Sequence, residues 1–300
     1  MNPSRNQTRT LSNFQFALAL TLPVLIFLVL LMAYPLGYAV WLSFHDIQFV
    51  FGKMRVDYVG FDNYVAVYRS PEFWHAVWIS MRFAIESVIL TILIGLGLAL
   101  VMNNRVGRSR FMRTLILLPW AVSLYGAGTM WFYLTSGQTG VVTAVSYWLG
   151  FDRPINLMSA STVVEILALG NAWNLAPLVA FFLLANLTTI PRRLYDLAAI
   201  DCLSPWARFI HVTLPPLRFT LFVFTSIAMV LSLRLFDFID IMSRGGPGDS
   251  STVLPYLLYD ISFKQLSLGY GAAMSFYLLA LIIVSTLALY FAWGRREEAV

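Results

Sequence analysis

The chain has 300 residues, of which 59% are hydrophobic and only 12% are charged, and its formal net charge is +5. A water-soluble domain of this size would have to expose much of that apolar surface, so the composition predicts a membrane protein and excludes a large soluble domain. The single cysteine, Cys202, excludes an internal disulfide and a cysteine-cluster metal site, and the three histidines stand far apart in sequence.

Six apolar stretches are long enough to cross a bilayer, because a helix needs about 20 apolar residues to span the roughly 30 Å hydrocarbon layer. The sequence therefore predicts an all-α membrane protein with about six transmembrane helices in one domain, between short tails at 1–13 and 295–300. The first stretch is too long for a cleavable signal and lacks a small-residue cleavage site, so a retained helix is expected. The predicted spans are 14–36, 80–103, 113–135, 161–189, 218–242 and 270–294.

The distribution of basic residues predicts the orientation of these spans. If the N-terminus is cytoplasmic, the inner segments hold about twice as many arginines and lysines as the outer ones. Both termini are therefore expected inside the cell. The inner set comprises Arg5, Arg9, Arg105, Arg108, Arg110, Arg113, Arg192, Arg193, Arg208, Arg218, Arg295 and Arg296.

The longest interior cytoplasmic connection, 191–217, is predicted to form two short helices. Pro191 is suited to begin a helix that ends near Cys202. Ser204 and Pro205 form an N-cap and first-turn pair, which predicts a second helix over 205–213. Pro215 and Pro216 are expected to prevent its continuation.

This loop has the composition of a contact surface for another protein. Ala198 and Ala199 would let a partner approach closely, and Asp196 and Asp201 would pair with its basic groups. The alternative is an amphipathic loop packed on its own bundle, and the residue spacing alone does not decide between them.

The segment from Asp196 to Pro215 resembles the EAA loop of permeases from binding-protein-dependent ABC importers, whose pattern is Glu-Ala-Ala, three residues, Gly, nine residues, then Ile-x-Leu-Pro. Asp196-Leu197-Ala198 stands for Glu-Ala-Ala, Asp201 keeps the acidic residue, and Val212-Thr213-Leu214-Pro215 closes the pattern. Cys202 replaces the glycine, so the turn either adopts a conformation that costs cysteine about 1 kcal/mol or keeps ordinary helical geometry.

Other stretches resemble the carbohydrate-importer permeases of the maltose and glycerol-phosphate type, and they occur in matching order over nearly the whole chain after residue 15. They are Ala33-Tyr34-Pro35 with Trp41-Leu42-Ser43-Phe44, Val59-Gly60-Phe61-Asp62-Asn63-Tyr64 with Pro71-Glu72-Phe73-Trp74, Leu118-Pro119-Trp120, Ser243-Arg244-Gly245-Gly246-Pro247-Gly248 and Gly269-Tyr270-Gly271-Ala272-Ala273.

The resemblance implies the fold of type I ABC importer permeases (MetI-like), with a transmembrane permease domain over 14–294 in the bacterial inner membrane. It implies a permease subunit that forms half of the pathway for a carbohydrate or related polyol derivative. It also implies partners: a second permease subunit, two ATPase subunits that bind ATP and Mg, an external solute-binding protein, and membrane lipid. The ATPase-coupling residues that it implies are Asp196, Leu197, Ala198, Ala199, Asp201, Cys202 and Leu203.

No phosphate-binding loop is present in the sequence, because Gly52-Lys53 is followed by Met54 rather than by Ser or Thr. We therefore expect a non-catalytic subunit that binds no cofactor itself. The alternative function is a secondary transporter or channel that works without an ATPase, a class that more often contains inverted repeats. A membrane enzyme would need a converging set of His, Asp, Cys or Ser groups, against which the scattered histidines argue.

Polar residues within the predicted spans are candidates for the solute pathway, because ionisable groups at membrane depth are costly. Arg234, Asp237 and Asp240 would follow one face of the fifth span and line the pore or form a gate. The alternatives are a structural pair between Arg234 and Asp237, or an Asp240 that lies beyond the bilayer. The amides and aromatic rings of the candidate set suit sugar hydroxyls and sugar faces. The pathway candidates are Asn171, Trp173, Asn174, Arg234, Phe236, Asp237 and Tyr277, with Tyr125 as a further aromatic residue.

Glu86, Glu165 and the segment 245–248 each have a structural explanation as well as a functional one. Glu86 and Glu165 are expected at the outer interface. The turn-rich segment 245–248 is either a plain external connector or, as the resemblance implies, a region near the docked solute-binding protein.

Overall fold

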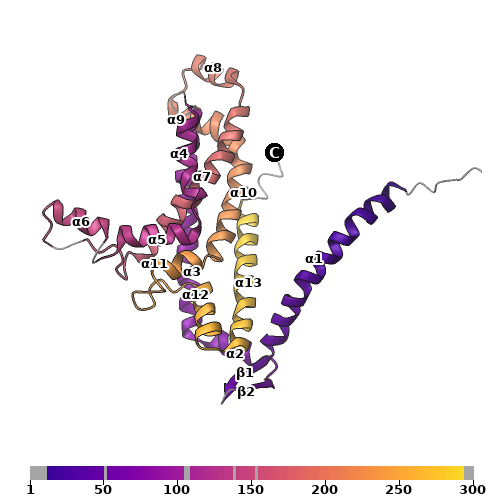
Figure 1. The fold of residues 1–300 in the computed structure, drawn as a ribbon. Coiled ribbons are helices and arrows are strands. Elements are labelled where there is room, and N and C mark those ends of the chain that lie inside the picture. Colours follow the sequence, from indigo (N-terminus) through magenta and orange to yellow (C-terminus); the bar gives the residue numbers. More distant parts are fainter. Residues whose placement is uncertain (1–11, 51–52, 105–108, 138–139, 153–154, 294–300) are drawn as a thin grey trace, which may run out of the picture.

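The structure, a computed structural model, describes residues 12–50, 53–104, 109–137, 140–152 and 155–293. It is a bundle of long helices with one β-hairpin at one end and α8 at the other, and α5, α6 and α11 extend from the side of the bundle (Figure 1). Five helices are long and apolar enough to cross a membrane, or six if a bent pair counts as one span. The helices are α1 Asn13–Ser43, α2 Asp62–Arg69, α3 Pro71–Asn103, α4 Arg110–Ala121, α5 Leu124–Thr135, α6 Val141–Trp148, α7 Val163–Thr189, α8 Arg192–Ile200, α9 Pro205–Arg208, α10 Leu214–Leu233, α11 Asp237–Met242, α12 Leu254–Tyr259 and α13 Leu268–Ala292, with π-helical turns at Phe209–Thr213 and Asp260–Lys264.

Helices α3 and α7 form the centre of the bundle, and α10 packs against both. Their contact is close because small residues face each other. A Cβ at Gly95 would lie 3.0 Å from the Val179 side chain and 3.1 Å from the Ala176 carbonyl oxygen. Such small-residue contacts are how membrane helices gain packing energy without a hydrophobic driving force.

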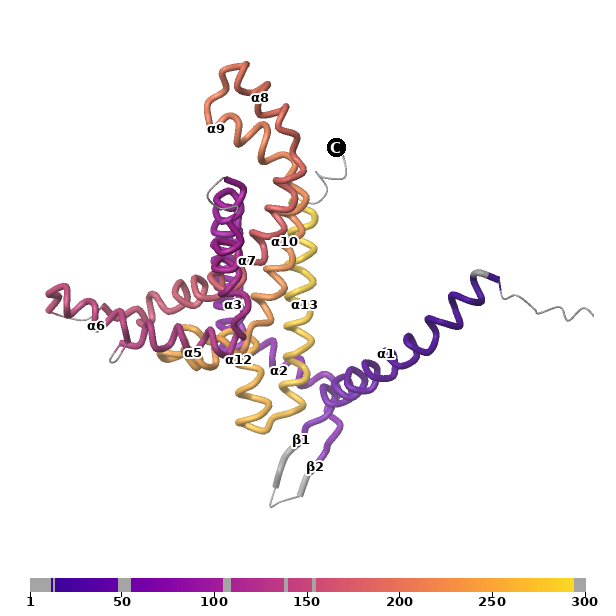
Figure 2. The backbone as a smooth tube through the Cα atoms, turned by 45° about the horizontal axis from the view of Figure 1, so that its top comes forward, coloured from indigo at the N-terminus to yellow at the C-terminus, as the bar shows by residue number. Residues whose placement is uncertain are grey.

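Helix α1 stands apart from the bundle (Figures 1 and 2). None of its 18-residue apolar stretch is buried, and its contacts are made with α13 and β1. Its C-terminal end is anchored by Asn63, whose Nδ2 donates to the carbonyl oxygens of Ser43 and His45 at 3.0 Å each. Gly269 on α13 lies so close to the His45 carbonyl that a Cβ would approach it to 1.8 Å.

A β-hairpin follows α1 and was not predicted from the sequence. Strands β1 (His45–Val50) and β2 (Lys53–Tyr58) pair antiparallel, with His45 opposite Tyr58. The hairpin lies at the opposite end of the molecule from α8 (Figure 1). It adds a small sheet to a fold whose helical membrane class is confirmed.

The third predicted span, 113–135, is wrong as one continuous helix. Helices α4 and α5 meet at an angle of 94°. Val122 is extended (ψ 131°) and the Ser123 hydroxyl accepts from the Gly126 backbone N–H at 3.2 Å, so a new helix begins there. Pro119 lies one turn before the bend, which is a common place for a helix to break.

The fifth predicted span, 218–242, is also broken. Helix α10 ends at Leu233, and α11 begins at Asp237 after a three-residue link. Just after the break Phe238 is fully buried, and a Cβ at Gly170 on α7 would lie 2.4 Å from its Cζ. Arg234 and Asp237 therefore do not share one continuous helical face, contrary to expectation.

The predicted stop before Pro215 and Pro216 is wrong. The residues from Pro205 to Leu233 form one helix of 29 residues that contains both prolines. The π-helical turn ends with the Leu214 N–H donating to the Phe209 carbonyl. Helix α10 begins at Leu214, so the two prolines lie in its first turn. Prolines are tolerated at such first-turn positions, and the widened turn accommodates their missing donors.

Candidate functional site

The segment 191–213, here called the elbow, projects beyond the ends of α3 and α7 (Figures 1 and 2). Side-chain bonds hold its two arms together. The Tyr195 hydroxyl lies 3.2 Å from the Thr213 hydroxyl, and Arg208 Nε donates to the Leu203 carbonyl oxygen at 2.9 Å. Ser204 caps the second arm, as predicted, by accepting from the Ala207 N–H at 3.2 Å.

Cys202 occupies the left-handed conformation at the end of α8, with φ 53°. The N–H of Leu203 donates to the Ala198 carbonyl at 3.0 Å, and the N–H of Cys202 donates to the Ala199 carbonyl at 3.1 Å. This pair of bonds is the helix-ending motif that usually places glycine at the left-handed residue. Of the two geometries expected at this position, the structure has the one that costs cysteine energy.

Most of the coupling candidates are exposed on the elbow. Asp196, Ala199, Asp201 and Cys202 are exposed, Leu197 is 45% exposed, and Leu203 is partly buried. Ala198 is only 4% exposed, because its own chain covers it. The expectation that Ala198 lets a partner approach is therefore wrong for this residue, and Ala199 is the small residue on the surface.

The exposed face of the elbow mixes apolar and charged groups. Leu194 is 44% exposed, Ile200 75% and Trp206 69%, and Arg192 and Arg193 are exposed beside them. Apolar anchors within a charged rim are the usual anatomy of a protein contact surface.

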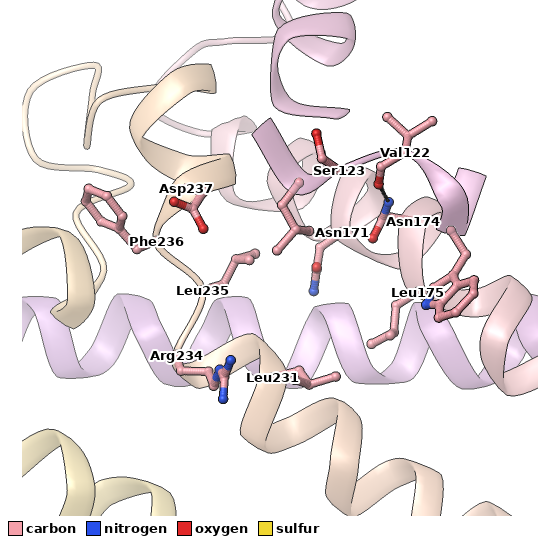
Figure 3. A pocket seen from close by; sticks show the side chains of 12 residues that line it. Val122, Ser123, Asn171, Asn174, Leu175, Leu231, Arg234, Leu235, Phe236 and Asp237 are labelled. Carbon is pink, nitrogen blue, oxygen red and sulfur yellow. Dashed lines mark hydrogen bonds between the residues drawn. The ribbon is translucent and has the colours of Figure 1, made fainter. Parts of the chain in front are cut away.

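A pocket of about 390 Å³ lies where the two broken helices meet α7. Figure 3 shows its side chains converging from α7, from the α4–α5 bend and from the link between α10 and α11. The pocket brings together five of the seven pathway candidates. Its lining is Trp120, Val122, Ser123, Leu124, Asn171, Asn174, Leu175, Leu231, Arg234, Leu235, Phe236 and Asp237.

The two asparagines of the pocket are tied into its walls. Asn171 Nδ2 donates to the hydroxyls of Ser87 (2.6 Å) and Ser232 (3.1 Å), which joins α7 to α3 and α10. Asn174 Nδ2 donates to the carbonyl oxygens of Pro119 (2.8 Å) and Val122 (3.2 Å). It thereby satisfies carbonyls freed by the bend between α4 and α5. Both amide nitrogens are fully used, so each side chain offers a ligand only its oxygen.

Arg234 and Asp237 are the charged residues of the pocket, and both are exposed. Within the described chain no ion pair joins them or pairs either one with another residue. Figure 3 places them on opposite sides of Leu235. The structural Arg234–Asp237 pair considered from the sequence is therefore not formed.

Two pathway candidates lie elsewhere. Trp173 lines a separate apolar pocket of about 320 Å³ and meets the Trp131 ring at 6.2 Å. The Tyr277 hydroxyl donates to the Tyr64 carbonyl oxygen at 3.1 Å, near the hairpin end. Tyr125 is 68% exposed and does not line the pocket. The sequence prediction missed Trp120 and Ser123, although Ser123 was detectable as an N-cap after a proline.

Glu86 and Glu165 share one arginine. Arg82 Nε donates to Glu86 Oε1 at 2.9 Å, and its guanidinium also contacts the Glu165 carboxylate. This triad joins α3 to the first turn of α7 and lies outside the pocket lining.

The turn-rich loop after α11 is internally bonded. Ser251 Oγ donates to the Gly246 carbonyl oxygen at 2.7 Å, and Gly245 (φ 79°) and Gly248 (φ 66°) supply left-handed turns. Next to it, the hydrogen bond from Lys264 lowers the pKa of Asp260 below 3.8, and the same bond raises the pKa of Lys264. In the described part of the chain no cluster of His, Cys, Asp and Glu is arranged to hold a metal ion.

Comparison with solved structures supports the fold. The chain matches a protein in a crystal structure of a bacterial ABC transporter that imports the acidic polysaccharide alginate, with a TM-score of 0.78, 22% identity, and 93% of this chain and 95% of that chain covered. A chain of the MetNI methionine ABC transporter in an inward-facing conformation matches with a TM-score of 0.50, 16% identity, and coverage of 75% of this chain and 94% of that chain.

Comparison with characterised sequences identifies relatives over most of the chain. The sulfoquinovosyl glycerol transport system permease protein SmoG of Agrobacterium fabrum is 33% identical, covering 90% of this chain and 87% of the relative. The trehalose/maltose permease MalF of Thermococcus litoralis is 30% identical (91% and 92%), and the sn-glycerol-3-phosphate permease UgpA of Escherichia coli is 31% identical (89% and 90%).

The model of one protein family, described as the binding-protein-dependent transport system inner membrane component, matches residues 91–293. This match includes the elbow and every helix that lines the pocket. The chain therefore belongs to the family of inner-membrane permease components of binding-protein-dependent transport systems.

Proposed function

We propose that this chain is a permease subunit of an ATP-driven importer and forms half of the pathway for a carbohydrate or related polyol derivative. The observation that carries the proposal is the elbow, a rigidly bonded projection with exposed apolar and acidic residues, in a chain of the permease family. Its transmembrane domain is residues 14–294, and the coupling loop is 191–217.

The ATPase is proposed to dock on the exposed face of α8. Asp196 and Asp201 carry unpaired charges within the described chain, and Leu197 and Ile200 supply apolar area. The elbow must be rigid because it can pass motion of the ATPase to the transmembrane helices only if it does not deform. The bonds of Tyr195 and Arg208 supply that rigidity.

A second permease is proposed to cover part of the surface that this chain leaves open. Helix α1 buries none of its apolar stretch against its own bundle, and the pocket lining includes the exposed residues Arg234 and Asp237. Two such subunits would enclose a pathway that one leaves open. The heteromeric complex then comprises two permeases, two ATPase subunits and an external solute-binding protein.

The distribution of basic residues and the position of the elbow support a proposed orientation with both termini in the cytoplasm. The ATPase is on the cytoplasmic side, so the elbow end of the bundle is cytoplasmic and the hairpin end is external. Helix α13 runs from the hairpin end toward the elbow end (Figure 1), which agrees with a cytoplasmic C-terminus. The internally bonded loop 243–252 then lies outside, where a solute-binding protein would dock.

The solute class rests on the relatives and on the pocket. Relatives are named for sulfoquinovosyl glycerol, trehalose or maltose, and glycerol 3-phosphate, all of which carry several hydroxyls or polyol frames. The pocket offers amide oxygens and the Phe236 and Trp120 rings, which suit hydroxyls and sugar faces.

The test is isolation of the complex followed by reconstitution in liposomes. Pull-down of the tagged chain is expected to bring an ATPase subunit and a second permease, and uptake is expected to require ATP and the solute-binding protein. Transport by the chain alone, without an ATPase, would instead support a secondary transporter or channel.

A further inference from the structure

The pocket between the two helix breaks contains one arginine, and this arginine has no carboxylate partner in the described chain. We propose that the imported solute carries an anionic group on a polyhydroxylated frame, and that Arg234 binds this group. The inference rests on the proposed function, because it assigns a solute class to the pocket of the same permease.

The position of Arg234 makes it a ligand for an anion rather than a structural cation. Arg82, which lies within helix α3, pairs with the carboxylate of Glu86, whereas no carboxylate pairs with Arg234 in the described chain. Arg234 instead ends the 20-residue helix α10, where the negative end of the helix stabilises the charge until a solute arrives. Its planar guanidinium can bind a carboxylate, phosphate or sulfonate through two parallel hydrogen bonds.

The rest of the pocket selects hydroxyl donors. The amide nitrogens of Asn171 and Asn174 are already used by the serines and by the carbonyls of the bend. Their oxygens and the Asp237 carboxylate are acceptors, and two of these three groups carry no charge. An acceptor-rich wall facing a single arginine fits a molecule that has hydroxyls along its frame and one anion at its end.

The size of the pocket agrees with this class. About 390 Å³ within one subunit lies in the range of small-molecule sites, roughly 300–1,000 Å³, and holds a sugar unit with a charged substituent. Asp237 balances the charge of the free pocket from the far side of Leu235 without occupying the guanidinium.

The experiment uses the intact complex with its solute-binding protein, reconstituted in liposomes. Uptake is compared within matched pairs that differ only in the anion: glucuronate and glucose, galacturonate and galactose, glycerol 3-phosphate and glycerol, sulfoquinovosyl glycerol and glucosyl glycerol. The expected result is ATP-dependent import of an anionic member at least about tenfold faster than its neutral counterpart, the value of one charged hydrogen bond. Import of neutral members alone would overturn the inference and leave the proposed function standing.

Substitution then tests Arg234 itself. Arg234→Gln is expected to lower uptake of the anionic solute at least about tenfold and to reduce its preference over the neutral counterpart, and Arg234→Lys should restore part of that preference. Co-purification of the ATPase subunit checks that both variants assemble. Arg110→Gln, which removes an exposed arginine outside the pocket, is the control and keeps the preference. An unchanged preference in Arg234→Gln overturns the inference, whereas failure of the unmodified chain to assemble with an ATPase overturns the proposed function.

Discussion

Leu203 donates its backbone N–H to the carbonyl oxygen of Ala198 at 3.0 Å, across the left-handed residue Cys202. This bond closes α8 and fixes the direction in which the elbow turns. A left-handed non-glycine residue costs roughly 1–2 kcal/mol, so the elbow keeps its shape against local strain.

Replacement of Cys202 is therefore expected to act through the backbone. Cys202→Gly should stabilise the complex by about 1 kcal/mol, and Cys202→Val, with a β-branched side chain, should destabilise it by a similar amount. Thermal unfolding of the purified complex measures both, with Cys202→Ala as the variant that removes only the thiol. Equal stability of the Gly and Val variants would show that the left-handed turn is not maintained in solution.

Charge reversal at Asp196 is expected to weaken ATPase docking. Asp196→Arg places a cation where an acidic group is proposed to meet the partner, and such an interface change costs about 2–5 kcal/mol. We expect at least a tenfold loss of uptake, about what 1.4 kcal/mol gives, with less ATPase subunit in the pull-down. Asp152→Arg, an exposed charge reversal far from the elbow in sequence, serves as the control.

The neighbouring alanines separate docking from folding. Ala199 is exposed, so Ala199→Arg should block docking while membrane insertion and subunit stability persist. Ala198 is buried, so Ala198→Arg should disrupt the elbow itself and lower stability. Limited proteolysis of the elbow distinguishes the two; identical digestion of both variants would contradict this assignment.

Asn174 is expected to stabilise the bend between α4 and α5. Asn174→Leu leaves the Pro119 and Val122 carbonyls without their side-chain donor, at a cost of about 1–3 kcal/mol. Asn174→Asp should cost more, because a carboxylate oxygen would face two carbonyl oxygens. The unfolding temperatures of the two complexes give the order, and an Asp variant as stable as the native chain would refute it.

Tyr277 is expected to contribute to the stability of the subunit and not to solute binding. Tyr277→Phe removes the hydrogen bond to the Tyr64 carbonyl, which contributes about 1 kcal/mol. Because Tyr277 lies outside the pocket, the concentration dependence of uptake should not change. A change in the apparent KM for uptake would instead indicate that Tyr277 contacts the solute.

The Asp260–Lys264 pair outside the membrane predicts a flat pH response. The lowered pKa of Asp260 means that its contribution is present above 3.8 and is lost as the pH falls through the folded value. The raised pKa of Lys264 means that its contribution is lost only above 10.5. The difference in unfolding temperature between Lys264→Met and the native complex should thus be constant from about pH 5 to about pH 9. A trend across this window would contradict the pairing.

The helices could be predicted from the sequence because apolar length alone specifies a span, but their breaks could not. Hydropathy does not report that Phe238 needs the space beside Gly170, or that Asn174 on another helix supports the Pro119 carbonyl. At both breaks, the contacts involve segments far apart in sequence. The proline pair was misjudged for a local reason, since the π-helical turn that accommodates it has no clear sequence signal.

The pocket was partly predictable because buried amides and charges in apolar helices are rare. Asn171 and Asn174 lie three apart, on one face of α7, and both reach the pocket. Trp173 lies two residues after Asn171, and because a helix turns by about 100° per residue, its side chain is directed to the opposite side of α7. Helical spacing alone would therefore have excluded Trp173 from the predicted pocket. Ala198 could not be assigned, because its burial depends on how the elbow folds back.

The helix from Pro205 to Leu233 joins the elbow, the proposed docking site, to the pocket, the proposed solute site. One end begins in the elbow, and the other ends beside Arg234, roughly 43 Å away at the usual rise per residue. A tilt of about 10° at one end would sweep the other by roughly 7 Å. Motion that ATP hydrolysis drives at the elbow would therefore be transmitted along this one helix to the pocket. A flexible insertion within the helix should uncouple ATP hydrolysis from solute transport.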